Sequence, residues 1–294
     1  MPALRSTLRG VRAFVLDADG VLLFRGAPIA GAAEAVGELR RRGVPYRVVT
    51  NYSSAHRSSL AAGFAKATGL EVDGAEIITA ASAAASYTAK HQPGARLLVL
   101  AAPDARREWD GQHVVTPAEA EAGSEPVAAV VIGDAGDELS FGNLDIAFRQ
   151  LRAGAAFVAM HRNPWWLTPK GYTLDAGAAV AGLEFALGRK AVICGKPSPV
   201  VFRQALAELR AQLAGGPRPA GHAQPHGSGG ARLRAADVVM VGDDPSADIA
   251  AARRAGLRGV LVLTGKTSAA TARAAGLAAG SVAADLRAVV AAAG

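Results

Sequence analysis

The feature that most constrains the fold is a repeated alternation of short, largely apolar runs with segments of helical periodicity. The runs Val11–Leu16 and Val44–Val49 are typical of parallel strands that are buried on both faces. Between them, Ala30–Arg42 spaces its apolar residues as a helix does and ends at Gly43. The later runs that predict strands are Arg96–Leu100, Ala128–Ile132, Ala155–Met160, Ala191–Cys194, Val238–Val241 and Val260–Leu263. This alternation predicts an α/β fold with parallel sheets.

The charge of the chain limits the classes of partner that we expect it to bind. The 294 residues include 32 Lys and Arg against 25 Asp and Glu, which gives a formal net charge of +7. The basic residues are scattered and are not interleaved with aromatic residues, so we expect no nucleic-acid partner. A mildly positive field would instead attract small anionic substrates.

The single cysteine, Cys194, excludes an internal disulfide, and its apolar surroundings in the sequence predict a buried, inert thiol. No run is long enough to span a bilayer, and no N-terminal apolar run follows a basic region. We therefore expect a cytoplasmic protein without a membrane partner. The segment 213–230 is rich in Gly and Pro and predicts a flexible surface loop with no catalytic part.

The first predicted strand ends in Asp17-Ala18-Asp19-Gly20. Two carboxylates this close repel each other unless a positive charge lies between them. The pair is therefore either a solvated turn or a site that holds a cation and performs chemistry.

Three further polar motifs end later strands: Thr50-Asn51, the GKPS motif of residues 195–198 and the GDDPSAD motif of residues 242–248. Ligands of parallel α/β sheets bind beyond the carboxyl ends of the strands, so Asp17, Thr50 and Asp243 should face one crevice. Carboxylates suit a hard cation such as Mg²⁺. A lysine and a hydroxyl group suit the oxygens of a phosphoryl group.

Each motif alone is weak, but the four in this order resemble the haloacid dehalogenase superfamily of phosphohydrolases over nearly the whole chain. The stretches VTNYSS, GKPSPVVF and VGDDPSADIAAARRAG carry much of the resemblance. The spacing is similar to the branch with a large α/β cap between the second and third motifs, which includes para-nitrophenyl phosphatase, pyridoxal phosphatase, phosphoglycolate phosphatase and phospholysine/phosphohistidine/pyrophosphate phosphatase. The resemblance implies a Rossmann-like catalytic core of residues 1–81 and 188–294 and an inserted cap, residues 82–187, that sets substrate specificity.

The resemblance also implies catalytic roles for the two aspartates of the first motif. Asp17 is expected to be the nucleophile that forms an aspartyl-phosphate. Asp19 is expected to protonate the leaving oxygen and then to activate water. Mg²⁺ would be bound by Asp17, by the backbone carbonyl of Asp19 and by Asp243.

The other three motifs supply the remaining expected site residues. Thr50, Asn51 and Lys196 should hold the phosphoryl oxygens. Asp248 is expected to support the metal ligands from behind, and Asp244 is expected to be either a neighbour of a ligand or a helix cap.

A polar and aromatic segment, HRNPWW, follows the predicted strand 155–160. In the resembled family this region is a cap loop that faces the substrate, which implies specificity contacts. The alternative is a surface loop whose tryptophans pack internally or at a subunit contact. The candidate specificity residues are His161, Arg162, Asn163 and Trp165.

These expectations combine into a Mg²⁺-dependent phosphohydrolase that acts on a small phosphorylated metabolite through an aspartyl-phosphate. A rival keeps the site but cleaves pyrophosphate or a P–N bond. A rival of another class is a non-catalytic ligand-binding or regulatory protein on the same fold. Dehalogenation is disfavoured, because it has no need for Asp19 as a leaving-group acid. The sequence predicts neither the natural substrate nor the oligomeric state. The resemblance implies a homodimer through the cap as one possible assembly.

Overall fold

The structure is a computed structural model that describes residues 2–123, 125–168, 171–215 and 232–294. The chain divides into two compact units, each discontinuous in sequence. Unit 1 comprises Met1–Thr50, Leu60–Ile78 and Lys196–Gly294, and unit 2 comprises Asn51–Ser59 and Thr79–Gly195. Apart from residues 213–215, the predicted loop 213–230 lies outside the described residues.

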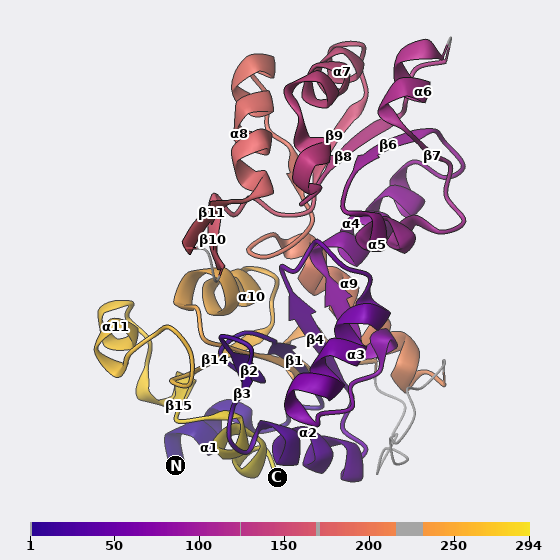
Figure 1. Cartoon of the computed structure of the whole chain (residues 1–294). Helices are drawn as coiled ribbons and strands as arrows, with labels where there is room; N and C mark the ends of the chain where they lie inside the picture. Colours follow the sequence, from indigo (N-terminus) through magenta and orange to yellow (C-terminus); the bar gives the residue numbers. More distant parts are fainter. Residues whose placement is uncertain (1, 124, 169–170, 216–231) are drawn as a thin grey trace. The chain divides into compact units, whose positions relative to one another are not determined.

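Unit 1 is built on a six-stranded sheet with the strand order β15-β14-β13-β1-β4-β5. Figure 1 labels β1, β4, β14 and β15 of this sheet. Pairing is parallel between β1 and both of its neighbours, between β13 and β14, and between β14 and β15. This sheet confirms the predicted parallel α/β fold. Its strands are β1 (Ala13–Asp17), β4 (Tyr46–Thr50), β5 (Ile77–Thr79), β13 (Val238–Gly242), β14 (Arg258–Val262) and β15 (Val282–Ala283).

One face of this sheet carries the larger apolar cluster of unit 1. Successive strand residues point to opposite faces, so Phe14 and Leu16 of β1 share this face with Val239 and Val241 of β13. The helices that contribute to the same cluster are α1 (Pro2–Leu8), α2 (Ala32–Arg41), α3 (Arg57–Thr68) and α12 (Leu286–Ala292). A two-stranded hairpin, β2 (Leu23–Phe24) and β3 (Ala27–Pro28), follows β1.

The opposite face is covered in part by α9 (Pro199–Leu213). Arg47 points from β4 to this helix, where its guanidinium donates to Glu208 Oε2 at 2.9 Å and to Gln212 Oε1 at 2.7 Å. The buried charge of Arg47 is thereby paired, as burial requires. The other helices of unit 1 are the π-helix η5 (Pro245–Ala250), α10 (Ala251–Arg254) and α11 (Ala269–Ala274).

Unit 2 has a five-stranded parallel sheet with the order β12-β9-β8-β6-β7. Its strands are β6 (Leu97–Leu100), β7 (Val114–Val115), β8 (Ala129–Ile132), β9 (Ala156–Ala159) and β12 (Val192–Ile193). The helices of this unit are α4 (Ala80–His91), α5 (Pro103–Arg106), α6 (Pro117–Ala122), α7 (Phe141–Arg152) and α8 (Ala176–Leu187). Short 3₁₀ turns in the two units are η1 (Gly74–Glu76), η2 (Arg107–Trp109), η3 (Gly136–Leu139), η4 (Ala235–Asp237) and η6 (Ala279–Ser281).

An antiparallel hairpin also belongs to unit 2. It pairs β10 (Trp165–Thr168) with β11 (Gly171–Leu174). The HRNPWW segment, interpreted above as a loop, thus ends inside a strand. Trp165 is 53% exposed and its ring meets the Tyr172 ring edge-on with 4.9 Å between centroids, so it does not pack internally as one interpretation proposed.

The structure also bears on the predicted cysteine and on membrane-spanning helices. Cys194 is fully buried, which confirms the predicted buried thiol, and burial raises the pKa of this thiol to about 12. Among the described residues, no helix has the length and apolar character needed to cross a membrane.

Trp109 anchors the core of unit 2. Its side chain is 1% exposed and its Nε1 donates a hydrogen bond to Thr88 Oγ1 at 3.0 Å. Trp109→Ala is therefore expected to lower the free energy of unfolding by about 3–5 kcal/mol, as measured by urea denaturation. Phe185 is 92% exposed, so Phe185→Ala is the matched control and should change stability by less than about 0.5 kcal/mol. Equal losses from the two variants would contradict this assignment.

Candidate functional site

Strand register brings three of the predicted site residues to one edge of the unit 1 sheet. β1 pairs Asp17 with Val49 on one side and Leu16 with Val241 on the other. Thr50 and Asp243 each follow shortly after these partners, so both lie beside Asp17 at the carboxyl ends of adjacent strands. Thr50 is 4% exposed and Asp243 is 3% exposed, which makes this edge a buried polar site.

The turn after β1 separates the two aspartates of the first motif. Asp17 is 6% exposed and its Oδ1 accepts a hydrogen bond from the Ala18 amide at 2.7 Å. Asp19 is exposed, and the Gly20 amide donates to Leu23 O at 2.7 Å to close the turn. Partial desolvation raises the pKa of the Asp19 carboxyl, against the opposing effect of nearby lysines. A raised pKa suits a group that must give and take a proton near neutral pH.

Lys196 connects the nucleophile candidate to the fourth motif. Its Nζ lies 2.6 Å from Asp17 Oδ1 and 2.8 Å from Asp248 Oδ1. Burial lowers the pKa of Lys196, but the attraction of Asp17 and Asp248 outweighs burial and raises it above its ordinary value. Lys196 is therefore a fixed buried cation between two carboxylates.

Asp248 lies on the π-helix η5, and both of its oxygens have partners. Oδ1 contacts Lys196, and Oδ2 accepts a hydrogen bond from the Asp244 amide at 3.0 Å. The residue has no exposed surface, and a Cβ on Gly242 would lie 2.3 Å from Asp248 Oδ2. Only a glycine therefore leaves room for this carboxylate at the end of β13.

Asp244 caps the π-helix. Its Oδ1 accepts hydrogen bonds from the amides of Ser246 at 2.7 Å and Ala247 at 2.8 Å. Of the two interpretations of Asp244 made from the sequence, the helix cap is the one these contacts describe. Its Oδ2 pairs with Lys266 Nζ at 2.9 Å.

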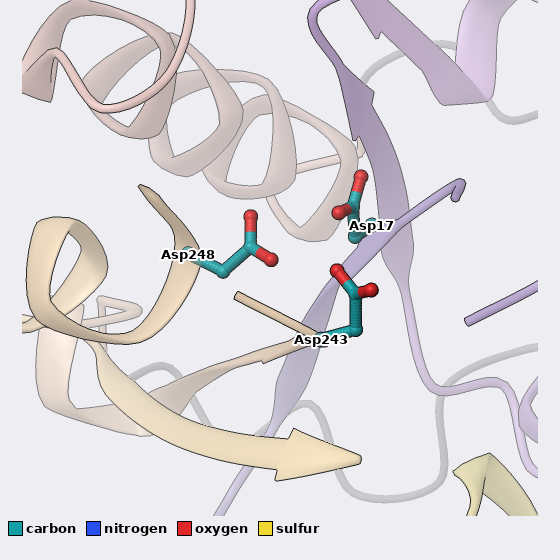
Figure 2. Close-up of side chains that lie close together, drawn as sticks. All are labelled: Asp17, Asp243 and Asp248. Carbon is teal, nitrogen blue, oxygen red and sulfur yellow. The ribbon is translucent and has the colours of Figure 1, made fainter. Parts of the chain in front are cut away.

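The three buried carboxylates form one cluster. Asp17, Asp243 and Asp248 each offer an oxygen, and these oxygens lie within 4.8 Å of one another. Figure 2 shows the three carboxyl groups turned toward a common space. Burial and then the nearby Asp248 raise the pKa of Asp17 well above its ordinary value, although Lys196 opposes them, and burial likewise raises the pKa of Asp243.

The donor set of this cluster fits a divalent cation. Positive charge is in deficit, because Lys196, the one buried lysine among the described residues, contacts two of the three buried carboxylates. Hard oxygen donors with a net negative charge are what Mg²⁺ and Ca²⁺ bind. Both carboxylate oxygens of Asp248 already contact protein groups, so Asp17 and Asp243 are better placed to hold a cation.

Asn51 belongs to unit 2, although it directly follows Thr50 in the chain. Its Nδ2 donates to Asn163 Oδ1 at 3.4 Å. A Cβ on Gly195 would lie 2.6 Å from Asn51 Oδ1, so glycine is required there for close packing. Asn51 thus meets one of the candidate cap residues inside unit 2.

His161 is 2% exposed, and its ring nitrogens have distinct neighbours. The Asn163 amide donates to Nδ1 at 3.3 Å, and Nε2 lies 2.8 Å from Ser53 Oγ and 3.6 Å from Asp175 Oδ1. Burial lowers the pKa of His161 in spite of Asp175. A neutral ring that is protonated on Nε2 satisfies these contacts.

Arg162 is engaged inside unit 2 as well. Its Nη2 contacts Glu184 Oε2 at 2.7 Å, and Lys190 Nζ contacts the same oxygen at 2.9 Å. Trp165 differs from these residues, because it presents its ring on the exposed hairpin. Among the four candidate specificity residues, Trp165 is the one with an apolar side chain, and that side chain is available for contact with a ligand.

A fifth strand end, which none of the four sequence motifs contains, contributes to the site. Thr264, Gly265 and Lys266 follow β14, and the Lys266 amide donates to Asp243 Oδ2 at 2.8 Å. The signal was present in the sequence, because polar residues follow the predicted strand 260–263 just as they follow the other four.

Comparison with known proteins places this architecture in a family. Residues 14–114 match the family described as haloacid dehalogenase-like hydrolase, and residues 193–289 match the one described as HAD-hydrolase-like. The first match includes β1 and β4, and the second includes Lys196 and the end of β13. The two matches therefore contain all the strand ends that form the site.

Individual relatives match over almost the full chain. Phospholysine phosphohistidine inorganic pyrophosphate phosphatase of Bos taurus is 32% identical over 272 residues, 90% of this chain and 88% of that protein. A p-nitrophenyl phosphatase structure from Archaeoglobus fulgidus has a TM-score of 0.79 at 27% identity and covers 96% of this chain and 99% of that one. The magnesium complex of a glycerol phosphate phosphatase from Mycobacterium tuberculosis has a TM-score of 0.74 at 26% identity, with 96% of this chain and 77% of that chain covered. With these relatives and with the carboxylate–lysine site at the ends of its parallel strands, the chain belongs to the haloacid dehalogenase-like hydrolases and is an enzyme of that family.

Proposed function

We propose that this hydrolase is a Mg²⁺-dependent phosphatase of small phosphorylated metabolites that works through an aspartyl-phosphate on Asp17. The observation that carries the proposal is the buried Asp17–Lys196–Asp248 chain of contacts beside Asp243. A carboxylate nucleophile, a fixed ammonium and a further acidic group at one sheet edge are the parts that phosphoryl transfer requires.

In the first half-reaction, a carboxylate oxygen of Asp17 attacks phosphorus and the bond from phosphorus to the leaving oxygen breaks. Lys196 Nζ, which contacts Asp17 Oδ1 at 2.6 Å, is placed to pair with the negative oxygens of the transferring group. Thr50 lies at the end of the neighbouring strand β4 and can donate its hydroxyl to the same group. Asp19 gives its proton to the departing oxygen.

In the second half-reaction, water attacks the phosphorus of the aspartyl-phosphate and the bond to Asp17 breaks. Asp19, now ionised, takes the proton from that water. Inorganic phosphate leaves, and both aspartates return to their starting state. The raised pKa of Asp19 suits both proton transfers, since the group must be an acid first and a base second.

Asp17 and Asp243, with the backbone carbonyl of Asp19, would hold the metal. When it is bound, Mg²⁺ neutralises the clustered carboxylates and the phosphoryl oxygens. The related glycerol phosphate phosphatase has solved structures with magnesium and with calcium, which supports a divalent cation at this site.

We propose the substrate as a chemical class, a small phosphorylated metabolite. The related protein from Bos taurus is named for phospholysine, phosphohistidine and inorganic pyrophosphate. Cleavage of a P–N or P–O–P bond is therefore a second candidate function for the same site. Residues of unit 2 would decide between these substrates, and the exposed hairpin residues Trp165, Tyr172 and Leu174 are the candidates.

The test measures the release of inorganic phosphate from p-nitrophenyl phosphate under two conditions. One assay contains about 5 mM Mg²⁺, which is expected to saturate a weak oxygen site, and the other contains EDTA. We expect phosphate to be released with Mg²⁺ and the rate of release to be very low with EDTA. Pyrophosphate and phospholysine, assayed in parallel, separate the two candidate functions. Binding of phosphorylated ligands without release of phosphate from any of them would favour the non-catalytic protein on this fold.

A further inference from the structure

We propose that Thr264, Gly265 and Lys266 form a backbone clamp that positions Asp243 for the metal and ties it to the turn that carries Asp19. The proposal rests on the proposed function, because it treats Asp243 as a metal ligand. It adds a positioning element that none of the four sequence motifs contains.

The clamp lies next to the site because of sheet order. β14 is the neighbour of β13, and Gly242 pairs with Leu261 in the parallel register. The residues that follow the two strands therefore leave the sheet side by side. Residues 264–266 follow β14 just as Asp243 follows β13.

Asp243 is held from the β14 side by an amide and a glycine. The Lys266 amide donates to Asp243 Oδ2 at 2.8 Å, which fixes the rotation of the carboxylate. A Cβ on Gly265 would lie 2.0 Å from the same Oδ2, far inside contact distance. The carboxylate therefore packs directly against the Gly265 backbone, and Oδ1 is the oxygen left to take a cation.

The same carboxylate is held from the β1 side by Gly20. This residue has φ +78°, and a Cβ on it would lie 2.4 Å from Asp243 Cγ and Oδ2. Thr264 Oγ1 donates to Gly20 O at 2.6 Å. One hydroxyl therefore links the loop after β14 to the turn that begins with Asp17 and Asp19, so the two halves of the metal site keep their spacing.

The side chain of Lys266 is a lesser part of the clamp. Its Nζ pairs with Asp244 Oδ2 at 2.9 Å, but it is 60% exposed, and exposed pairs contribute little. The positioning effect therefore belongs to the backbone of residues 265 and 266 and to the Thr264 hydroxyl.

Gly265→Ala tests the packing. We expect its dissociation constant for Mg²⁺, measured by calorimetry without substrate, to rise about 10- to 100-fold, as occurs when groups that orient metal ligands are changed. In phosphate release, the Mg²⁺ concentration for half-maximal rate should rise in parallel, whereas the rate at saturating Mg²⁺ should fall much less. Gly63→Ala is the matched control, since Gly63 lies on α3 with open space around it and should bind Mg²⁺ like the wild type.

Thr264→Val and Thr264→Ser test the link to Gly20 and keep the proposal falsifiable if Gly265→Ala does not fold. Valine removes the hydroxyl with little change of shape and should weaken Mg²⁺ binding, whereas serine keeps the hydroxyl and should restore it. Urea denaturation without metal checks that all variants are folded.

The outcomes separate the clamp from the function on which it rests. If the wild type binds no Mg²⁺, the proposed metal site itself fails. If the wild type binds Mg²⁺ and folded Gly265→Ala and Thr264→Val bind it equally well, the clamp is wrong and the proposed function stands.

Discussion

Asp17→Asn is expected to abolish phosphate release, by about 10⁴-fold or more, and to leave no phosphorylated protein. Asp19→Asn should instead accumulate a phosphorylated form with p-nitrophenyl phosphate. The reason is that Asp17 supplies the attacking oxygen, whereas Asp19 supplies only protons. A nitrophenolate leaves with little protonation, so the first step survives without Asp19, but the water that must attack the aspartyl-phosphate has lost its base.

Intact-mass measurement after mixing each variant with substrate and Mg²⁺ distinguishes these cases. Asp110→Asn is the matched control, because Asp110 is an exposed aspartate of unit 2 and should react like the wild type. Equal phosphate labelling of Asp17→Asn and Asp19→Asn would show that Asp17 is not the nucleophile.

Lys196→Met is expected to cost both activity and stability. Phosphate release should fall about 10²–10³-fold, the usual loss when one charge-stabilising donor is removed. The folded protein would also keep Asp17 and Asp248 buried without their shared cation, which should lower the free energy of unfolding by about 3–5 kcal/mol near neutral pH.

The stability loss of Lys196→Met should shrink on acidification. In the folded protein the pKa of Asp17 already lies well above the ordinary 3.8, and removal of the ammonium raises it further. Between the unfolded and folded pKa values, the folded state binds more protons, so the free energy of unfolding falls as the pH rises through that window. Lowering the pH therefore protonates the buried carboxyl and restores part of the lost stability.

Urea denaturation without metal at two pH values measures this effect. Lys66→Met is the matched control, because Lys66 is exposed on α3, and it should show neither the loss nor its pH dependence. A loss that grows on acidification would mean that the Lys196 pairing is not what stabilises this part of unit 1.

Much of this site could be predicted from the sequence because its parts sit at the ends of apolar strands. The run 11–16 predicted β1 to within two residues, and parallel strands put their carboxyl ends at one edge. The helix predicted at 30–42 is α2, with Gly43 following its end at φ +64°. In these cases local pattern and tertiary packing favour the same structure.

Other features depend on contacts between segments distant in sequence. No pattern marks Asn51–Ser59 as part of unit 2, where Arg57 pairs at 2.7 Å with Glu108, whose side chain is fully buried. The π-helix that carries Asp248 departs from the 3.6-residue period on which helix prediction relies. The hairpin of Trp165 is short, because β10 and β11 have four residues each, and the residues of β10, WWLT, do not alternate between apolar and polar.

Unit 2 can finish its sheet during synthesis before unit 1 can. The strands of unit 2 all come from residues 97–193, whereas Ala13 of β1 waits for Val238 of β13. Until β13 is translated, about 50 residues after the last strand of unit 2 and roughly 2.5–10 s later at the usual rates, β1 keeps an open edge. Exposed edges recruit foreign strands, so the nascent chain is most prone to aggregation in this interval, and chaperones that shield it would raise the yield of folded protein.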